Sequence, residues 1–191
     1  MILDAGAQVL ARTGWAKFTT NAVAEAAGVS IGSLYQYFPN KLALVDAITH
    51  RHLETVLLLL GRIGDGDLPL DRRIEQLISG MIAIHAVDPG LHRVLMEEVP
   101  ISETMRAVHR QFETQHLERY RLLVRSARSG MPEDVEAVAA QVLSSAVAGV
   151  IHDAARRGNL RGEAVREELA RLVGACLQAG PPILDPPGGL A

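Results

Sequence analysis

The stretch AEAAGVSIGSLYQYFPNK, residues 24–41, has the pattern of two short helices joined by a tight turn. Gly28 stands where the first helix ends, a position that favours a residue able to adopt a positive φ. Pro39 prevents the second helix from continuing. Small apolar residues around the turn provide packing positions between the two helices: Val23, Ala24, Ala27, Val29 and Leu34. This pattern predicts a helix-turn-helix.

The second helix of such a unit enters the major groove of double-stranded DNA with its N-terminal part. Short side chains there let the helix backbone approach the base edges, and Ile31 can contact a thymine methyl group. Tyr35 and Tyr37 carry hydroxyls that can donate to phosphates, and Lys41 adds a cation at the start of the next helix. The alternative interpretation is that both tyrosines only cover a small hydrophobic core.

The longer stretch FTTNAVAEAAGVSIGSLYQYFPNKLALVDAI, residues 18–48, resembles the DNA-binding domain of the TetR (tetracycline repressor) family. The resemblance rests on a Thr pair, an Ala-Gly-Val turn, a Gly/Ser-x-Leu-Tyr recognition helix, an aromatic pair and an Asn-Lys before a long fourth helix. It implies a ligand-responsive transcriptional regulator, expected to be a repressor, that binds a near-palindromic operator as a dimer and is released by a small-molecule effector. It implies phosphate contacts from Thr20, Tyr35, Tyr37 and Lys41, and groove contacts from Asn21, Ser30, Ile31, Gly32 and Ser33.

The charge of the chain does not favour a general attraction to DNA phosphates, so DNA binding must depend on local contacts. The formal net charge is −3, and the few basic residues among the first 60 are balanced by acidic ones. Family members usually begin with a basic extension, whereas this chain begins at the first predicted helix. Either the natural start lies upstream or operator binding depends on hydroxyls and backbone N–H groups. We expect weak non-specific DNA affinity.

Other functional classes are less well supported by the residues. No nucleophile beside a base, no useful carboxylate pair and no phosphate-binding glycine loop is recognised, so we predict that the protein is not an enzyme and has no cofactor. A helical dimeric interaction protein without DNA binding remains the alternative. The single cysteine, Cys176, suits a reducing cytoplasm, and the longest uncharged segment, residues 137–151, is too short to span a membrane.

Apolar residues recur at spacings of three and four, which predicts an all-α fold of about nine helices. We expect helices over residues 2–13, 20–28, 30–37, 41–60, 70–87, 89–98, 101–129, 132–157 and 163–179. The Gly/Asp/Pro segment 64–69 breaks the chain. The predicted organisation is a helix-turn-helix DNA-binding domain (1–48) with three helices, a larger ligand-binding and dimerisation domain (49–180) and a flexible tail (181–191).

The predicted helix at residues 132–157 is uncharged on most of its circumference, and the last helix also carries an apolar stripe. A helix of this kind is buried on both sides, and a second subunit is the simplest partner in a chain of this length. Two helices from each subunit would form a four-helix interface, as in TetR-family homodimers. The alternative is burial of both helices within one subunit.

His85 and His116 lie on apolar stripes of two predicted central helices, so both imidazoles are expected to point inward. In the family that the sequence resembles, the central helices enclose the effector cavity. We therefore expect a mostly apolar pocket for a small, lipophilic effector, lined by Met81, His85, Leu91, Leu95, Phe112, His116 and Tyr120. The competing interpretation is that both histidines are core residues satisfied by their neighbours.

Two pairs of histidines are seven residues apart: His85 with His92, and His109 with His116. On a straight helix that spacing separates the side chains by about 10 Å, which is too far for one ion to bridge. Residues 89–90, Pro-Gly, interrupt the first pair. We therefore predict no metal site.

Overall fold

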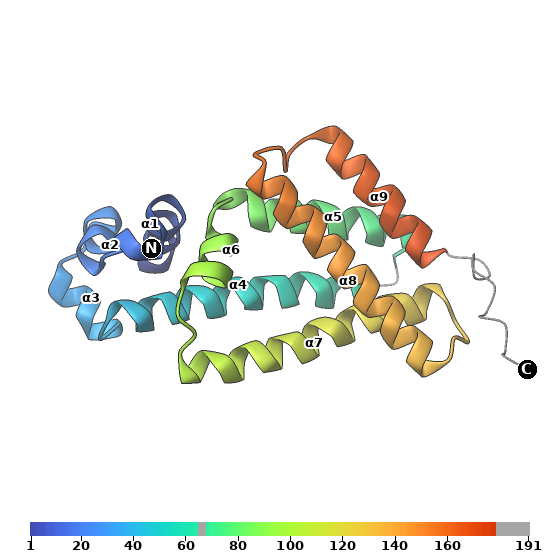
Figure 1. Cartoon of the computed structure of the whole chain (residues 1–191), viewed down its shortest axis with the longest axis horizontal. Coiled ribbons are helices and arrows are strands. Elements are labelled where there is room, and N and C mark those ends of the chain that lie inside the picture. Colours follow the sequence, from blue (N-terminus) through green and yellow to red (C-terminus); the bar gives the residue numbers. More distant parts are fainter. Residues whose placement is uncertain (65–67, 179–191) are drawn as a thin grey trace, which may run out of the picture.

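The computed structural model describes residues 1–64 and 68–178. Within these ranges all regular structure is helical, with nine α-helices and one short π-helix, so the all-α prediction is confirmed. The predicted flexible tail, 181–191, and the centre of the predicted break at 64–69 lie outside the described residues. Figure 1 shows three short N-terminal helices at one end, joined to the remaining helices by the long α4.

The N-terminal helices are α1 (Ile2–Lys17), α2 (Thr20–Ala27) and α3 (Ile31–Tyr37). The predicted stop at Gly14 is an interruption: Gly14 has a φ of 70°, and one further turn follows it within α1. Gly28 ends α2 in the left-handed region, with a φ of 65°, as the turn pattern predicts. The core between these helices contains Val23 and Leu34, which are both fully buried.

Helix α4 (Lys41–Gly64) belongs to both ends of the molecule. Asn40 caps it, because its Oδ1 accepts a hydrogen bond of 2.9 Å from the backbone N–H of Ala43. Leu44 and Ile48 from its first half pack into the N-terminal core, which we call the small core. Leu60 and other residues of its second half pack into a larger cluster built from the later helices, which we call the large core.

The large core is formed by α4 together with α5 (Leu70–Val87), α7 (Glu103–Ala127), α8 (Glu133–Arg156) and α9 (Glu163–Leu177). Helix α7 packs along α4 on one side and against α8 on the other (Figure 1). The helix predicted at 89–98 is instead the single turn α6 (Leu91–Arg93) followed by the π-helix η1 (Val94–Glu98). This short segment packs against α1, so it connects the two cores.

Polar contacts also hold α6, η1 and the start of α7 against the N-terminal part of the molecule. The carboxylate of Glu98, in η1, accepts a hydrogen bond of 2.9 Å from the backbone N–H of Trp15, in α1. The other carboxylate oxygen of Glu98 pairs at 2.5 Å with Arg93, in α6. Ser102, ahead of α7, donates to Asp46 in α4 at 2.8 Å. The position of α6 and η1 is therefore coupled directly to the end of α1.

Helix α8 leaves an apolar face open in the single chain. Val135, Val138 and Val142 are 46%, 61% and 56% exposed, although α8 also supplies buried residues to the large core. Its length and hydropathy would allow it to cross a membrane, a property that it shares with core helices of globular proteins. Its one buried acid, Glu136, receives hydrogen bonds from Arg121 and Arg125 of α7, and these bonds hold the pKa of Glu136 below its usual range.

The left-handed conformation of Gly28 generates a stability prediction. No heavy atom lies within 4 Å of the position of an added Cβ, so Gly28→Ala costs only backbone strain, about 1 kcal/mol of unfolding free energy. Gly28→Asn costs less, because asparagine tolerates this region better. Urea denaturation of both variants measures the difference. Equal stability of the alanine variant and the unaltered protein would contradict this assignment of strain.

Candidate DNA-binding face and effector site

The start of α3 presents a short-chained, exposed surface. Ser30 caps the helix: its Oγ accepts a hydrogen bond of 3.0 Å from the backbone N–H of Ser33 and lies 2.8 Å from the Ser33 hydroxyl. Ile31 is 37% exposed although it is apolar, and Gly32 beside it is also exposed. This is the side-chain composition that lets a helix approach base edges closely.

The two tyrosines of α3 lie outside the small core. Tyr35 and Tyr37 are 48% and 71% exposed, whereas Leu34, which precedes Tyr35, is fully buried. The hydroxyl of Tyr35 lies 3.1 Å from that of Thr20, at the start of α2. This hydrogen bond holds the Tyr35 ring at the junction of the two helices. The core-filling interpretation of these tyrosines does not fit, and contact with phosphates stays a prediction, as it does for the exposed Asn21.

Lys41 occupies a different environment from the one that the sequence suggests. Its ammonium donates to the backbone carbonyls of Trp15 (3.1 Å) and Phe18 (3.3 Å), and lies 3.8 Å from the centre of the Trp15 ring. A cation at these carbonyls stabilises the C-terminal end of α1. Lys41 therefore fixes the start of α4 against α1, and only its remaining N–H is left for a phosphate.

The residues predicted to line one apolar pocket do not surround one cavity. Leu91 and Leu95 are buried in the small core with α1, because the chain turns back before α6. Along α7, Phe112 stacks on His116 with ring centres 5.0 Å apart, and His116 meets Tyr120 edge-on at 5.1 Å. Met81 is buried in the large core and contributes its backbone carbonyl to His85. Of the seven predicted residues, His85 alone lines the cavity described below.

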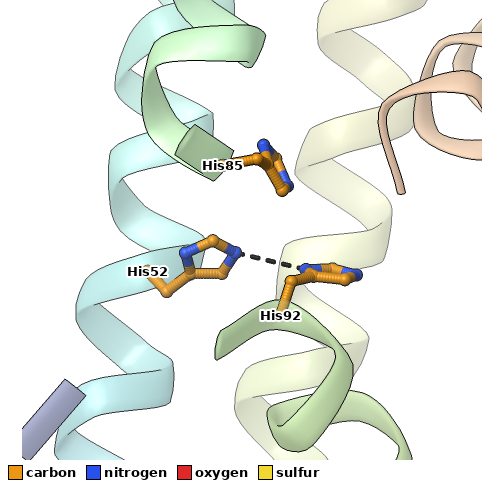
Figure 2. A group of neighbouring side chains, drawn as sticks. All are labelled: His52, His85 and His92. Carbon is orange, nitrogen blue, oxygen red and sulfur yellow. Dashed lines mark hydrogen bonds between the residues drawn. The ribbon is translucent and has the colours of Figure 1, made fainter. Parts of the chain in front are cut away.

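Four of the seven histidines come together from four helices: His52 of α4, His85 of α5, His92 of α6 and His152 of α8. Figure 2 shows His52, His85 and His92 directed toward one another. His52 Nε2 and His92 Nδ1 are 3.3 Å apart, and the ring of His152 stacks on that of His92 with centres separated by 3.7 Å. We call these four residues the histidine cluster.

The reversal of the chain before α6 explains why His85 and His92 meet. The seven-residue spacing excludes contact on a straight helix, but α5 ends at Val87 and α6 begins at Leu91. The ring centres of the two histidines are consequently only 5.3 Å apart. Gly90 makes this reversal possible, because an added Cβ would lie 2.8 Å from the backbone oxygen of Ala11. The geometric reason for predicting no metal here was therefore wrong, whereas His109 and His116 do lie on one continuous helix, α7.

A cavity of about 480 Å³ opens beside the histidine cluster. Its lining is more polar than the predicted pocket: it includes three histidines, Arg93, Glu97, Asp153 and Arg156, together with Met96 and small residues. Burial lowers the pKa of His52 and His152 to about 4 and that of His92 to about 2, with neighbouring histidines adding to the effect. The imidazoles are therefore neutral at pH 7, with lone pairs available.

Sequence reasoning missed His52 and His152 and considered His92 only as half of a spaced pair. His52 lies in the middle of α4 and His152 near the end of α8, so no local motif connects them with His85. The available signal was the number of histidines, seven in 191 residues, but it does not say which of them meet. Their meeting depends on packing of helices far apart in the sequence.

The half-buried His116 of α7 generates a pH prediction. Burial lowers the pKa of His116 to about 4, below the value of about 6.5 in an unfolded chain. The stability contributed by neutral His116 is therefore complete above pH 6.5 and is lost as the pH falls toward 4. His116→Gln should reduce the pH slope of the unfolding free energy by about 1 kcal/mol per pH unit in that interval. Urea unfolding across this range measures the slope, and identical slopes would contradict the burial effect.

Comparison with solved structures supports the fold. The structure of the fatty acid degradation regulator FadR from Bacillus halodurans matches with a TM-score of 0.71 at 19% identity, covering 94% of this chain and 97% of that one. A TetR-family transcriptional regulator from Streptomyces coelicolor matches with a TM-score of 0.61 at 25% identity, covering 92% and 95%. Both contain the same arrangement of helices over nearly the whole chain.

Curated relatives include nucleoid occlusion factors. The chain is 30% identical over 151 residues to SlmA of Vibrio campbellii (strain ATCC BAA-1116), covering 74% of this chain and 76% of that protein. It is 30% identical over 105 residues to SlmA of Marinomonas sp. (strain MWYL1), and that match spans 53%, about half, of the relative's length.

Two family models cover most of the chain. Residues 2–48 match the model described as bacterial regulatory proteins, tetR family, and residues 69–177 match the one described as tetracyclin repressor-like, C-terminal domain. Such regulators are generally not enzymes; they bind operator DNA as dimers and respond to ligands. With its helix-turn-helix, its helical second part and these matches, the chain belongs to the TetR family.

Proposed function

We propose that this protein is a cytoplasmic repressor that binds a near-palindromic operator as a homodimer and is released when a small effector enters the cavity beside the histidine cluster. The observation that carries the proposal is the exposed face of α3. Ser30, Ile31 and Gly32 form its leading edge, and the hydroxyl-bearing Tyr35 and Tyr37 follow on exposed positions. These residues supply base-edge and phosphate contacts without a basic surface.

The proposed dimer places α8 and α9 of each subunit in the interface. The open valines of α8 support this assignment, and so does Leu172 of α9, which is 38% exposed. A two-fold interface of this kind sets the distance between paired recognition helices at about 34–36 Å, one turn of DNA. The predicted domains follow from this division of roles, with residues 1–48 recognising DNA and 49–180 binding the effector and the second subunit.

The connection between cavity and DNA-binding face supports ligand control. Arg93 lines the cavity, and its guanidinium pairs with Glu98, which holds the backbone N–H of Trp15 in α1. The carbonyl of Trp15 in turn accepts from Lys41, at the start of α4 and close to α3. A ligand that displaces α6 therefore moves the contacts that orient the helix-turn-helix. It shifts the DNA-binding equilibrium only by its differential affinity for the two conformations.

The charged and imidazole side chains in the lining favour an effector with polar groups over the lipophilic one expected from the sequence. Arg93 and Arg156 line the cavity, each paired with a carboxylate, and the neutral histidines provide both donors and acceptors. Met96, Pro89 and the small residues of the lining supply apolar surface for a hydrophobic part of the effector.

Gly32 distinguishes DNA contact from protein stability. An added Cβ would meet only Ser30 Oγ, at 3.8 Å, so the folded chain accepts alanine and gains up to about 1 kcal/mol of helix stability. If the backbone approaches base edges here, the new methyl group should weaken operator binding at least about tenfold, or ~1.4 kcal/mol. Thermal melting and a shift assay give the two readouts. Unchanged operator affinity would remove Gly32 from the interface.

The proposed function is tested on the DNA that flanks the gene. Footprinting with the purified protein should show protection of two half-sites with centres about one helical turn apart. Tyr35→Phe should weaken binding to that site several-fold, because it removes a hydroxyl that donates a hydrogen bond to a DNA phosphate, a contact worth about 1 kcal/mol. His50→Gln, a surface change on α4, serves as the control and should bind normally. Absence of a protected site would reject the proposal.

A further inference from the structure

We propose that His52, His85 and His92 form a binding site for one divalent transition-metal ion of the Zn²⁺ class, and that the bound ion controls operator affinity. One ring nitrogen from each of the three lies within 4.8 Å of the others. They come from α4, α5 and α6, so the site ties together three separate elements (Figure 2).

The distances are close to those of a coordinated ion. Two nitrogens bound to tetrahedral Zn²⁺ at 2.0–2.1 Å lie about 3.4 Å apart. His52 Nε2 and His92 Nδ1 are already 3.3 Å apart. For both lone pairs to face one ion, His52 carries its proton on Nδ1 and His92 on Nε2. The separations from the His85 nitrogen, which extend up to 4.8 Å, shorten through side-chain rotation and a small movement of the short α6.

His85 already has the hydrogen bonding of a metal ligand. Its Nδ1 lies 2.9 Å from the backbone carbonyl of Met81, and because a carbonyl only accepts, the proton is on Nδ1. The lone pair of neutral His85 is therefore on Nε2. A backbone acceptor on the second ring nitrogen is the usual way in which a ligating histidine is oriented. The buried position of His85 keeps this arrangement in place.

The surroundings also favour a cation over a set of ordinary core histidines. Within residues 1–64 and 68–178, the hydrogen bonds of these three rings go to another imidazole or to a carbonyl, and not to a carboxylate. Imidazoles that pack against one another leave some of their ring nitrogens without hydrogen-bond partners, whereas a bound ion accepts one lone pair from each of the three rings. Glu97 and Asp153 line the adjoining cavity, where Arg93 pairs with Glu97, and Arg156 and Arg157 pair with Asp153.

The ligand set defines the class of metal. Three neutral imidazoles with no thiolate suit Zn²⁺, Cu²⁺, Ni²⁺ or Co²⁺ and exclude Mg²⁺ and Ca²⁺, which prefer oxygen ligands. Three histidines leave a fourth tetrahedral position open. Because His85 and His92 both line the cavity of about 480 Å³, that position is reached from the cavity by water or by a donor atom of an effector.

The regulatory step rests on the proposed function and uses α6. Drawing His92 toward His85 moves the segment that also carries Arg93, and Arg93 holds Glu98 against Trp15. The conformation in which the three histidines are drawn together therefore has a different contact between α6 and α1 from the conformation without an ion. An ion that binds the tightened form better lowers operator affinity by its preference for that form.

The metal site is tested on the full-length protein after removal of metals by EDTA. Equilibrium dialysis against ZnCl₂ should give one ion per chain, and CoCl₂ should produce the visible absorption of tetrahedral Co²⁺ with nitrogen ligands. His52→Gln and His92→Gln should each lose the stoichiometric ion, and the triple variant with His85→Gln as well should bind none. His50→Gln, two residues away on α4 and exposed, should keep it. Circular dichroism verifies that each variant is folded.

Two outcomes would overturn the site: the unaltered protein binds no ion, or the folded triple variant still binds one ion per chain. The regulatory step has a separate readout, because ZnCl₂ should lower operator affinity at least tenfold in a shift assay. Glu98→Gln should keep the ion but lose most of this decrease. Operator affinity that is unaffected by a bound ion would reject the control step. A protein that binds zinc but no operator would instead reject the proposed function.

Discussion

The reversal of the chain between α5 and α6 is the constraint on which the rest of the molecule depends. Gly90 approaches α1 so closely that an added Cβ would lie 2.8 Å from the backbone oxygen of Ala11. This close contact places Leu91 in the small core and His92 beside His85. One short segment therefore packs against the DNA-binding helices on one side and lines the cavity on the other. Without the reversal, a continuous helix would separate these two surfaces.

The segment has two kinds of contact, because its apolar side chains are buried in the small core while its polar side chains line the cavity or pair with neighbouring helices. The single turn of α6 continues into the π-helix Val94–Glu98, and π-helical turns are less stable than α-helical ones and are frequent at functional sites. Glu98 joins Arg93 to the backbone of Trp15, and Lys41 joins Trp15 to α4. This small polar network therefore joins a residue that lines the cavity, Arg93, to the end of α1 and the start of α4.

The electrostatics of the molecule differ between its two sites. Around α3 the chain offers hydroxyls and backbone groups and few cations, and Lys41 is engaged with carbonyls. Operator recognition of this kind depends less on counterion release and therefore less on salt than recognition by a basic surface. In the cavity, burial keeps the histidines neutral and so preserves their lone pairs for a proton donor or a metal ion.

The sequence by itself determined the helix-turn-helix, because its signals are local: the left-handed Gly28, the Ser30 and Asn40 caps, and the exposed tyrosines of α3 all depend on neighbours within a few residues. It also indicated the apolar face of α8 from periodicity alone. Only the tertiary structure brought together the histidine cluster and the cavity beside it. His52, His92 and His152 meet through helix packing across up to a hundred residues of sequence, and the predicted pocket was divided because a chain reversal sent Leu91 and Leu95 to the other core. The role of Lys41 was likewise decided by α1, whose carbonyls are brought to it only when the helices pack.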